Sequence, residues 1–114
     1  MTESEFIAAA DSTLAAIGGA LDAALAEASV DLDWSLVDGI LEIESADCGK
    51  LIVNRHVPNR ELWLAARSGG YHFAARAGGW RDTRTGLPLE VALAGVLQAQ
   101  TGLSIALPAL PAPA

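Results

Sequence analysis

The sequence is poor in the residues that usually build a catalytic centre. Its 114 residues include one cysteine, Cys48, and two histidines, His56 and His72. A lone cysteine forms no intramolecular disulfide and supplies no paired thiolates for a structural metal. The chain also lacks a glycine-rich phosphate loop and a recognisable serine or cysteine nucleophile motif. We therefore disfavour an enzyme with a deep active site, and interpret Cys48 as an ordinary turn residue and His72 as an ordinary exposed histidine.

Long apolar runs are also missing. Apolar residues make up 52% of the chain. Much of that share is alanine, and the uninterrupted runs are far shorter than the ~20 residues that span a bilayer. The opening, MTESEFIAAAD, is acidic and lacks the basic region and cleavage site of a secretory signal. We expect a single domain located in the cytoplasm, without a membrane partner.

Basic residues are absent from the first part of the chain. Residues 1–47 carry eleven acids and no Lys or Arg, whereas residues 48–114 carry seven bases and three acids. Their formal charges are therefore −11 and +4. The acidic part would repel phosphates, which argues against nucleic acid as a partner and favours a cation or a basic protein surface. A solvated face kept for solubility is the alternative interpretation.

The residues that are abundant predict a helix first. Apolar side chains recur every three or four positions and indicate an amphipathic helix over about residues 3–28. Thr2 followed by Glu5 fits a capping box at its start. Gly18 and Gly19 each cost about 1 kcal/mol relative to alanine inside a helix, so packing must hold this one in place.

From residue 30 the apolar period changes to two, which is typical of strands with one buried face. Turn signals, such as Asp38 followed by Gly39, divide this part of the chain. The pattern predicts six strands, over about residues 30–37, 40–45, 50–55, 61–67, 71–76 and 79–84.

A second helix is predicted after Gly86, with Pro88 suited to its first turn and an end near Gly102. Two helices around a meander predict an α+β two-layer sandwich, with both helices packed on one face of an antiparallel sheet of about six strands. We divide the chain into a domain over residues 1–107 and a Pro/Ala-rich tail over 108–114. The tail's prolines exclude a regular element, so we expect it to fray.

One predicted strand directs a tryptophan towards water. In RELWLA, the alternation turns Leu62 and Leu64 inwards and Trp63 outwards. Long neighbouring side chains such as Arg55 or Arg67 cover it in one interpretation. In the other, Trp63 contacts a partner, because tryptophan is enriched among the residues that dominate interface energies.

Carboxylates are the remaining candidate ligands. Asp31 and Asp33 share the outer face of the predicted first strand, at a spacing of about 6.5 to 7 Å. Asp22 and Glu27 extend this acidic edge along the preceding helix. Asp11 lies on the same helix flank as Asp22 but about 16 Å away along the axis, so the two cannot chelate one ion. Oxygen-only ligands favour hard ions such as Fe³⁺, Mg²⁺, Ca²⁺ or Mn²⁺, held weakly.

Several short motifs, in the same order as the predicted elements, resemble the bacterial frataxins. The resemblance extends over about residues 4–105 and is most specific in its second half. The motifs are SEF at residues 4–6, AD at 10–11, LD at 21–22, NR at 54–55, Pro58, WLA at 63–65 and GGYHF at 69–73.

This resemblance implies a noncatalytic role in iron–sulfur cluster assembly. Frataxins bind ferrous and ferric iron weakly along an acidic ridge formed by the first helix and first strand. They contact the cysteine desulfurase and its scaffold protein, modulate its rate, and have been proposed as iron donors. By the resemblance, the iron ligands here are Asp11, Asp22, Glu27, Asp31 and Asp33, and the partner-binding residues are Trp63, Asn54, Asp31 and Asp33.

The chain departs from the frataxin pattern by carrying fewer acids on the ridge. Where bacterial relatives often have further acids, this sequence has Gly18, Gly19, Ala23, Leu25 and Ser35. We therefore expect a monomer in the absence of metal, and storage of iron in large assemblies is disfavoured. Two alternatives to a regulator or iron donor are a ferroxidase that detoxifies iron, and an acidic protein-binding module whose metal binding is incidental.

Overall fold

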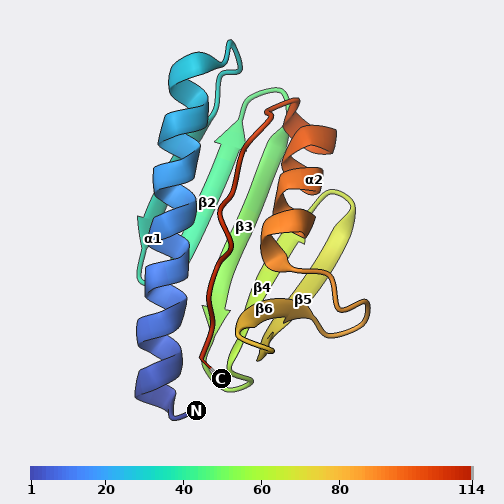
Figure 1. Ribbon diagram of the computed structural model, residues 1–114. Helices are drawn as coiled ribbons and strands as arrows, with labels where there is room; N and C mark the ends of the chain where they lie inside the picture. Colours follow the sequence, from blue (N-terminus) through green and yellow to red (C-terminus); the bar gives the residue numbers. More distant parts are fainter. Residues whose placement is uncertain (114) are drawn as a thin grey trace.

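The structure is a computed structural model that describes residues 1–113 and contains two helices and one six-stranded sheet (Figure 1). Every neighbouring strand pair is antiparallel, and the strands follow chain order across the sheet. The predicted fold class and element order are confirmed. The elements are α1 (Glu3–Glu27), β1 (Asp33–Val37), β2 (Ile40–Ser45), β3 (Gly49–His56), β4 (Glu61–Ala66), β5 (Gly69–Arg76), β6 (Gly79–Asp82) and α2 (Leu89–Thr101).

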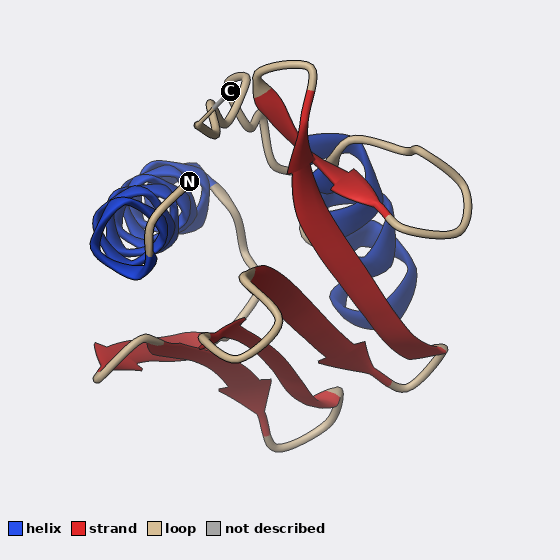
Figure 2. Ribbon diagram, turned by 90° about the horizontal axis from the view of Figure 1, so that it is seen from below, coloured by secondary structure: helices blue, strands red, loops and turns tan. Residues whose placement is uncertain are grey.

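Both helices cover the same face of a strongly twisted sheet, and the segment after α2 runs back between them (Figures 1 and 2). Contacts join α1 to β1 and β3, and α2 to β6. One continuous core fills the space between the layers, with residues from both helices and every strand except β1 fully or almost fully buried. Within residues 1–113, no helix or strand covers the opposite face of the sheet, which we call the outer face.

The first helix begins and packs as its sequence predicts. Thr2 and Glu5 form the reciprocal hydrogen bonds of a capping box. The length and apolar composition of α1 would also suit a membrane span. Its apolar stripe is instead buried against the sheet, as in a core helix, and consists of Phe6, Ala10, Leu14, Ile17 and Leu21.

Gly18 has a structural reason that Gly19 does not share. A Cβ atom at Gly18 would lie 2.6 Å from Cη2 of Trp34, whereas one at Gly19 would meet nothing within 4 Å. The missing side chain at Gly18 therefore lets the Trp34 indole of β1 lie directly against α1. The cost in helix propensity at this position is offset by a contact between α1 and the first strand.

The first strand is shorter than predicted, because it begins at Asp33 and not at residue 30. Asp33 pairs with Glu44, and β2 ends one residue later at Ser45, so residues 30 and 31 lie beyond the end of β2 and have no strand to pair with. Leu32 is nevertheless buried. The practical consequence is that Asp31 precedes the strand, and only Asp33 is held by the sheet.

The C-terminal tail docks on the domain, so the expectation that it frays is wrong. Leu110 is 2% exposed and belongs to the core. The Ala112 N–H donates a hydrogen bond to the Gly78 carbonyl, at 2.9 Å, and Pro111 bridges to Gly79 at the edge of β6. Prolines prevent a regular element here but do not prevent a leucine from packing. Residue 114 lies outside the described residues, and the domain boundary at 107 stays a prediction.

Candidate functional site

Two of the three predicted ligands on α1, Asp11 and Asp22, already have protein partners. Asp22 Oδ1 accepts a hydrogen bond from Trp34 Nε1 at 2.9 Å. Asp11 forms an ion pair with the guanidinium of Arg55, whose side chain lies across Gly39 in the β1–β2 turn. The two contacts join α1 to β1 and β3. Much of the charge at Asp11 is therefore compensated, although its side chain remains half exposed.

The other three predicted ligands, Glu27, Asp31 and Asp33, are exposed where α1 ends and β1 begins. Asp33 faces Glu44 across the β1–β2 pair. Nearby on the outer face, the Lys50 ammonium lies 3.7 and 3.8 Å from carboxylate oxygens of Glu42 and Glu44. This lysine partly neutralises the acidic edge of the sheet.

The five predicted ligands, which we call the acidic ridge, do not form a chelating centre. Within residues 1–113, no three His, Cys, Asp or Glu side chains gather closely enough to hold one metal ion. The ridge is instead a line of separated carboxylates. Such a surface attracts hydrated cations through its field and leaves water to complete their coordination, which gives low affinity and little selectivity.

Trp63 lies on the outer face, as predicted, but between two histidines. The ring centroid of His56 is 3.7 Å from that of Trp63, with an interplanar angle of 8°. On the other side, the His72 centroid lies at 4.2 Å and 5°. Strand register explains this ring stack, because His72 is directly opposite Trp63 and His56 is its diagonal neighbour on β3.

Hydrogen bonding fixes the orientation of the indole. Trp63 Nε1 donates to Glu61 Oε1 at 2.9 Å, and the same oxygen lies 3.7 Å from His72 Nδ1. His56 Nδ1 is buried and has no hydrogen-bond partner among the described residues. Because both faces of the indole are covered, Trp63 presents its ring edge to solvent.

The suggestion that arginines cover Trp63 is wrong. Arg55 turns to the helix side and pairs with Asp11, while Arg67 reaches the Asp47 carbonyl. His56 is the residue that sequence reasoning missed. The alternation of residues along β3 could have placed His56 on the same face as Trp63, since alternate residues of a strand share a face.

A row of outer-face residues extends from the ring stack across the sheet and ends in two exposed apolar side chains. Val37 is 63% exposed and Ile40 is 45% exposed, although both are in strands. Asn54 lies between Ile40 and Trp63, and its side-chain amide donates to the Arg55 carbonyl. Exposed apolar side chains that lie close together are typical of interaction surfaces. We call this strip the Trp63 row, and it consists of Val37, Ile40, Asn54, Trp63 and His72.

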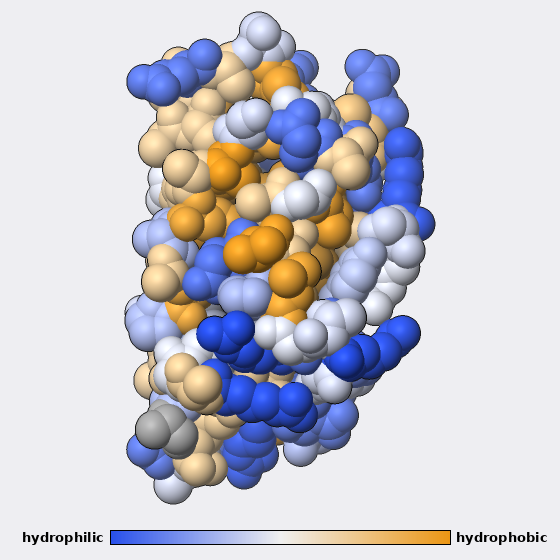
Figure 3. All heavy atoms as spheres, turned by 45° about the vertical axis from the view of Figure 1, so that its right-hand side comes forward, coloured by the Kyte–Doolittle hydropathy of each residue, from blue (hydrophilic) through white to orange (hydrophobic). Residues whose placement is uncertain are grey.

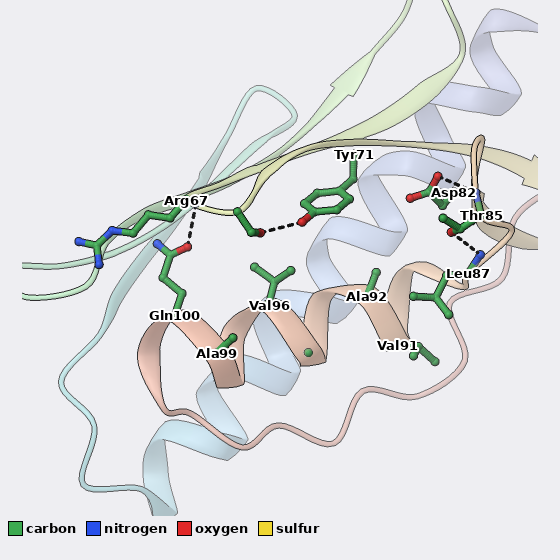
Figure 4. Close-up of a pocket in the computed structure, with 12 residues that line it drawn as sticks. Arg67, Tyr71, Asp82, Thr85, Leu87, Val91, Ala92, Val96, Ala99 and Gln100 are labelled. Atoms are coloured by element: carbon green, nitrogen blue, oxygen red, sulfur yellow. Dashed lines mark hydrogen bonds between the residues drawn. The ribbon is translucent and has the colours of Figure 1, made fainter.

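A second apolar region, a groove of about 790 Å³, lies beside α2 on the helix side of the molecule (Figure 4). Figure 3 shows apolar side chains gathered over this side. Exposed Leu87 and Val91 contribute to it. Its polar groups are largely paired with one another or with backbone: the Tyr71 hydroxyl lies 2.7 Å from that of Ser68, and Asp82 accepts from two backbone N–H groups.

Comparison with known proteins agrees with the fold and the motifs. Residues 1–103 match the model of the frataxin-like domain family. The iron-sulfur cluster assembly protein CyaY of Dechloromonas aromatica is 46% identical over 108 residues, which cover 94% of this chain and 99% of that protein. The protein of the same name from Ralstonia nicotianae is 40% identical over 107 residues, covering 94% and 95%.

Solved structures are similar over most of the chain. A frataxin from Psychromonas ingrahamii, of the CyaY family, superposes with a TM-score of 0.81 at 28% identity, covering 92% of this chain and 96% of the other. The trimeric frataxin of Saccharomyces cerevisiae complexed with ferrous iron gives a TM-score of 0.71 at 26% identity, covering 82% and 86%. With a family model that spans residues 1–103 and relatives that match from end to end, this chain belongs to the frataxin family, in its bacterial CyaY branch.

Proposed function

We propose that this chain acts in bacterial iron–sulfur cluster assembly, as a noncatalytic iron-binding protein that regulates a cysteine desulfurase and its scaffold protein. The observation that carries the proposal is the near end-to-end match to proteins named for that process. The chain works in the cytoplasm and is a monomer without metal, in contrast to the trimeric yeast frataxin.

The acidic ridge receives the iron in this proposal. Glu27, Asp31 and Asp33 are exposed and supply carboxylate oxygens, which suit both Fe²⁺ and Fe³⁺. Asp11 and Asp22 add to the negative field, and Asp22 has one of its two carboxylate oxygens engaged by the Trp34 N–H. Iron is cargo here, weakly bound and easily passed on, which is what an iron donor requires.

The partner surface combines the outer face with the acidic edge. Trp63 and Asn54 lie in the Trp63 row, Asp33 lies at the acidic edge of the sheet opposite Glu44, and Asp31 lies just before β1. The charge of −11 on residues 1–47 is complementary to a basic partner. Short-range contacts at Trp63 supply affinity, and the carboxylates steer the approach.

A ferroxidase is the less favoured alternative. Oxidation of Fe²⁺ by oxygen requires acids grouped tightly enough to hold iron and oxygen together, and within residues 1–113 no group of three candidate ligands is found. The acidic binding module with incidental metal binding has more support, because two of the five ridge acids already have protein partners.

The deciding experiment is a desulfurase pulldown and activity assay, with Fe²⁺ and with a chelator. The variant with Asp31→Lys and Asp33→Lys reverses the exposed end of the ridge, and Glu3→Lys is a charge-reversal control at the other end of α1. An iron-dependent regulator loses binding or rate control through the double variant only when iron is present. If the double variant loses desulfurase binding in chelator as well, the protein-binding module is the correct function. If the double variant behaves like the unmodified chain, the acidic ridge has no role in the interaction.

A further inference from the structure

The ring stack places two titratable groups against the residue that we assign to partner contact. Imidazole is the side chain that ordinarily changes charge between pH 5 and 8. We propose that the outer face around Trp63 binds a basic protein partner with His56 and His72 neutral, so that acidification from pH 8 to pH 6 weakens the complex. This regulation rests on the proposed function of Trp63 as a partner-binding residue.

His56 carries the larger share of the effect. Its Nδ1 atom is buried and has no hydrogen-bond partner. A proton added there becomes a donor without an acceptor, so the charge of a protonated ring is stabilised only by water at the partly exposed remainder of the ring. A partner that covers the ring stack removes that water, so the protonated form is penalised more in the complex than in the free protein.

His72 contributes less to the pH dependence of binding, because the Glu61 carboxylate lies close to it. Its Nδ1 atom lies 3.7 Å from Glu61 Oε1, and the His72 side chain is 47% exposed while that of Glu61 is 17% exposed. Protonated His72 can pair with this oxygen. The same oxygen already accepts the Trp63 N–H, so the two donors compete once the stack is covered.

Besides Glu61, whose Oε1 atom already accepts the Trp63 N–H, the surroundings offer little negative charge to stabilise added protons. In strand register, His56 is opposite Glu61, followed by Ala74 and Arg81, while His72 continues the row of Trp63, Asn54 and uncharged Ile40. Protonation therefore adds positive charge to a part of the face that already carries Arg81. A basic partner is repelled by that change. The charged residues of the neighbouring rows and the adjoining turn are Glu61, Glu42, Arg60 and Arg81.

The test is the affinity of the full chain for a cysteine desulfurase from the same organism, in chelator and at constant ionic strength, between pH 6 and pH 8. The readout is the ratio of dissociation constants at the two pH values. For the unmodified chain we expect weakening of about three- to tenfold at pH 6. His56→Gln should remove most of this ratio, His72→Gln a smaller part, and the double variant nearly all of it.

Calorimetry supplies a second readout that is independent of absolute affinity. Binding at pH 6.5 should release protons, seen as a heat that depends on the ionisation enthalpy of the buffer, and the double variant should lose that dependence. Arg76→Gln, which removes a charge that does not titrate in this range, should keep the ratio of the unmodified chain. Thermal melts establish that each variant is folded.

The outcomes separate this inference from the function on which it rests. If the unmodified chain and the double glutamine variant show the same ratio while Trp63→Ala weakens binding, the histidine inference is overturned and the partner surface stands. If Trp63→Ala leaves desulfurase binding unchanged at pH 8, the partner surface itself is rejected, and the regulation falls with it.

Discussion

On the acidic ridge, five carboxylates stand apart and two of them are already partnered, whereas around Trp63 three aromatic rings lie with neighbouring centroids about 4 Å apart. The ridge acts through charge, which is summed over distance and tolerates the loss of one member. The ring stack acts through contact, which fails when one ring is removed. The two regions therefore suit different tasks, namely attraction of cations and partners on one side and specific docking on the other.

The largest expected effect comes from removing the centre of the stack. Trp63→Ala should weaken desulfurase binding by more than about 2 kcal/mol, roughly thirtyfold, because buried tryptophans dominate interface energies. Stability should fall by only about 1 kcal/mol, the usual worth of aromatic stacking at a partly exposed site. Titration calorimetry and thermal melts measure the two quantities. Val91→Ala, at an exposed apolar site on α2, is the control. If Trp63→Ala causes a large loss of stability without loss of binding, the role of Trp63 is purely structural.

A pair of glycines probes how the ridge is built. Gly18→Ala forces the Trp34 indole away from α1 and should destabilise the fold by about 1 kcal/mol even after the gain in helix propensity. Gly19→Ala has open space and should stabilise by up to about 1 kcal/mol. Urea unfolding of both variants measures the difference of about 2 kcal/mol. Equal effects at the two positions would contradict the packing assigned to Trp34.

Charge removal at the exposed end of the ridge should have a smaller effect. Asp31→Asn combined with Asp33→Asn should lower the apparent Fe²⁺ affinity by several-fold and leave stability within about 0.5 kcal/mol, since both side chains are exposed. Amide NMR shifts during an anaerobic Fe²⁺ titration report the affinity and the site. Trp63→Ala is the cross-control and should titrate like the unmodified chain. If the shifts do not map to residues 22–33, iron does not bind at the acidic ridge.

The smallest effect is at the first turn of α1, far from both regions. Hydrogen bonds from Thr2, first from its backbone and then from its side chain, hold the pKa of Glu5 below its ordinary value of 4.5. A lowered folded-state pKa contributes stability above pH 4.5 that is lost as the pH falls below it. Glu5→Gln should therefore melt slightly lower than the unmodified chain at pH 7, and the gap should narrow towards pH 3.5. If the difference in melting temperature widens on acidification, the assigned direction of the Glu5 pKa shift is wrong.

Local sequence patterns predicted most of the fold. The capping box at Thr2, the turn at Gly39 and the inward leucines on either side of Trp63 all depend on residues close together in the chain. Hairpins between consecutive strands then leave one arrangement for the meander. The first strand was misjudged at its start because pairing depends on where β2 ends, which the alternation in residues 30–37 does not report.

The candidate site was less accessible to such reasoning. The alternation of residues in the strand predicted that Trp63 faces outwards, and the charge distribution pointed to the acidic ridge. Neither pattern reveals that Asp11 pairs with Arg55, 44 positions away, or that Asp22 receives the Trp34 N–H. Those partners depend on how α1 crosses the sheet, so the prediction of free ligands on the helix overestimated the charge that is available.

By itself, then, the sequence determined the elements, their inward and outward faces and the separation of charge, because periodicity and charge are properties of short segments. The tertiary structure alone decided that Gly18 receives the Trp34 indole, that Leu110 packs into the core, and that His56 and His72 enclose Trp63. Each of those contacts joins segments that meet only through strand register or the crossing of layers. Their physical basis is the relative position of whole elements, which no local pattern encodes.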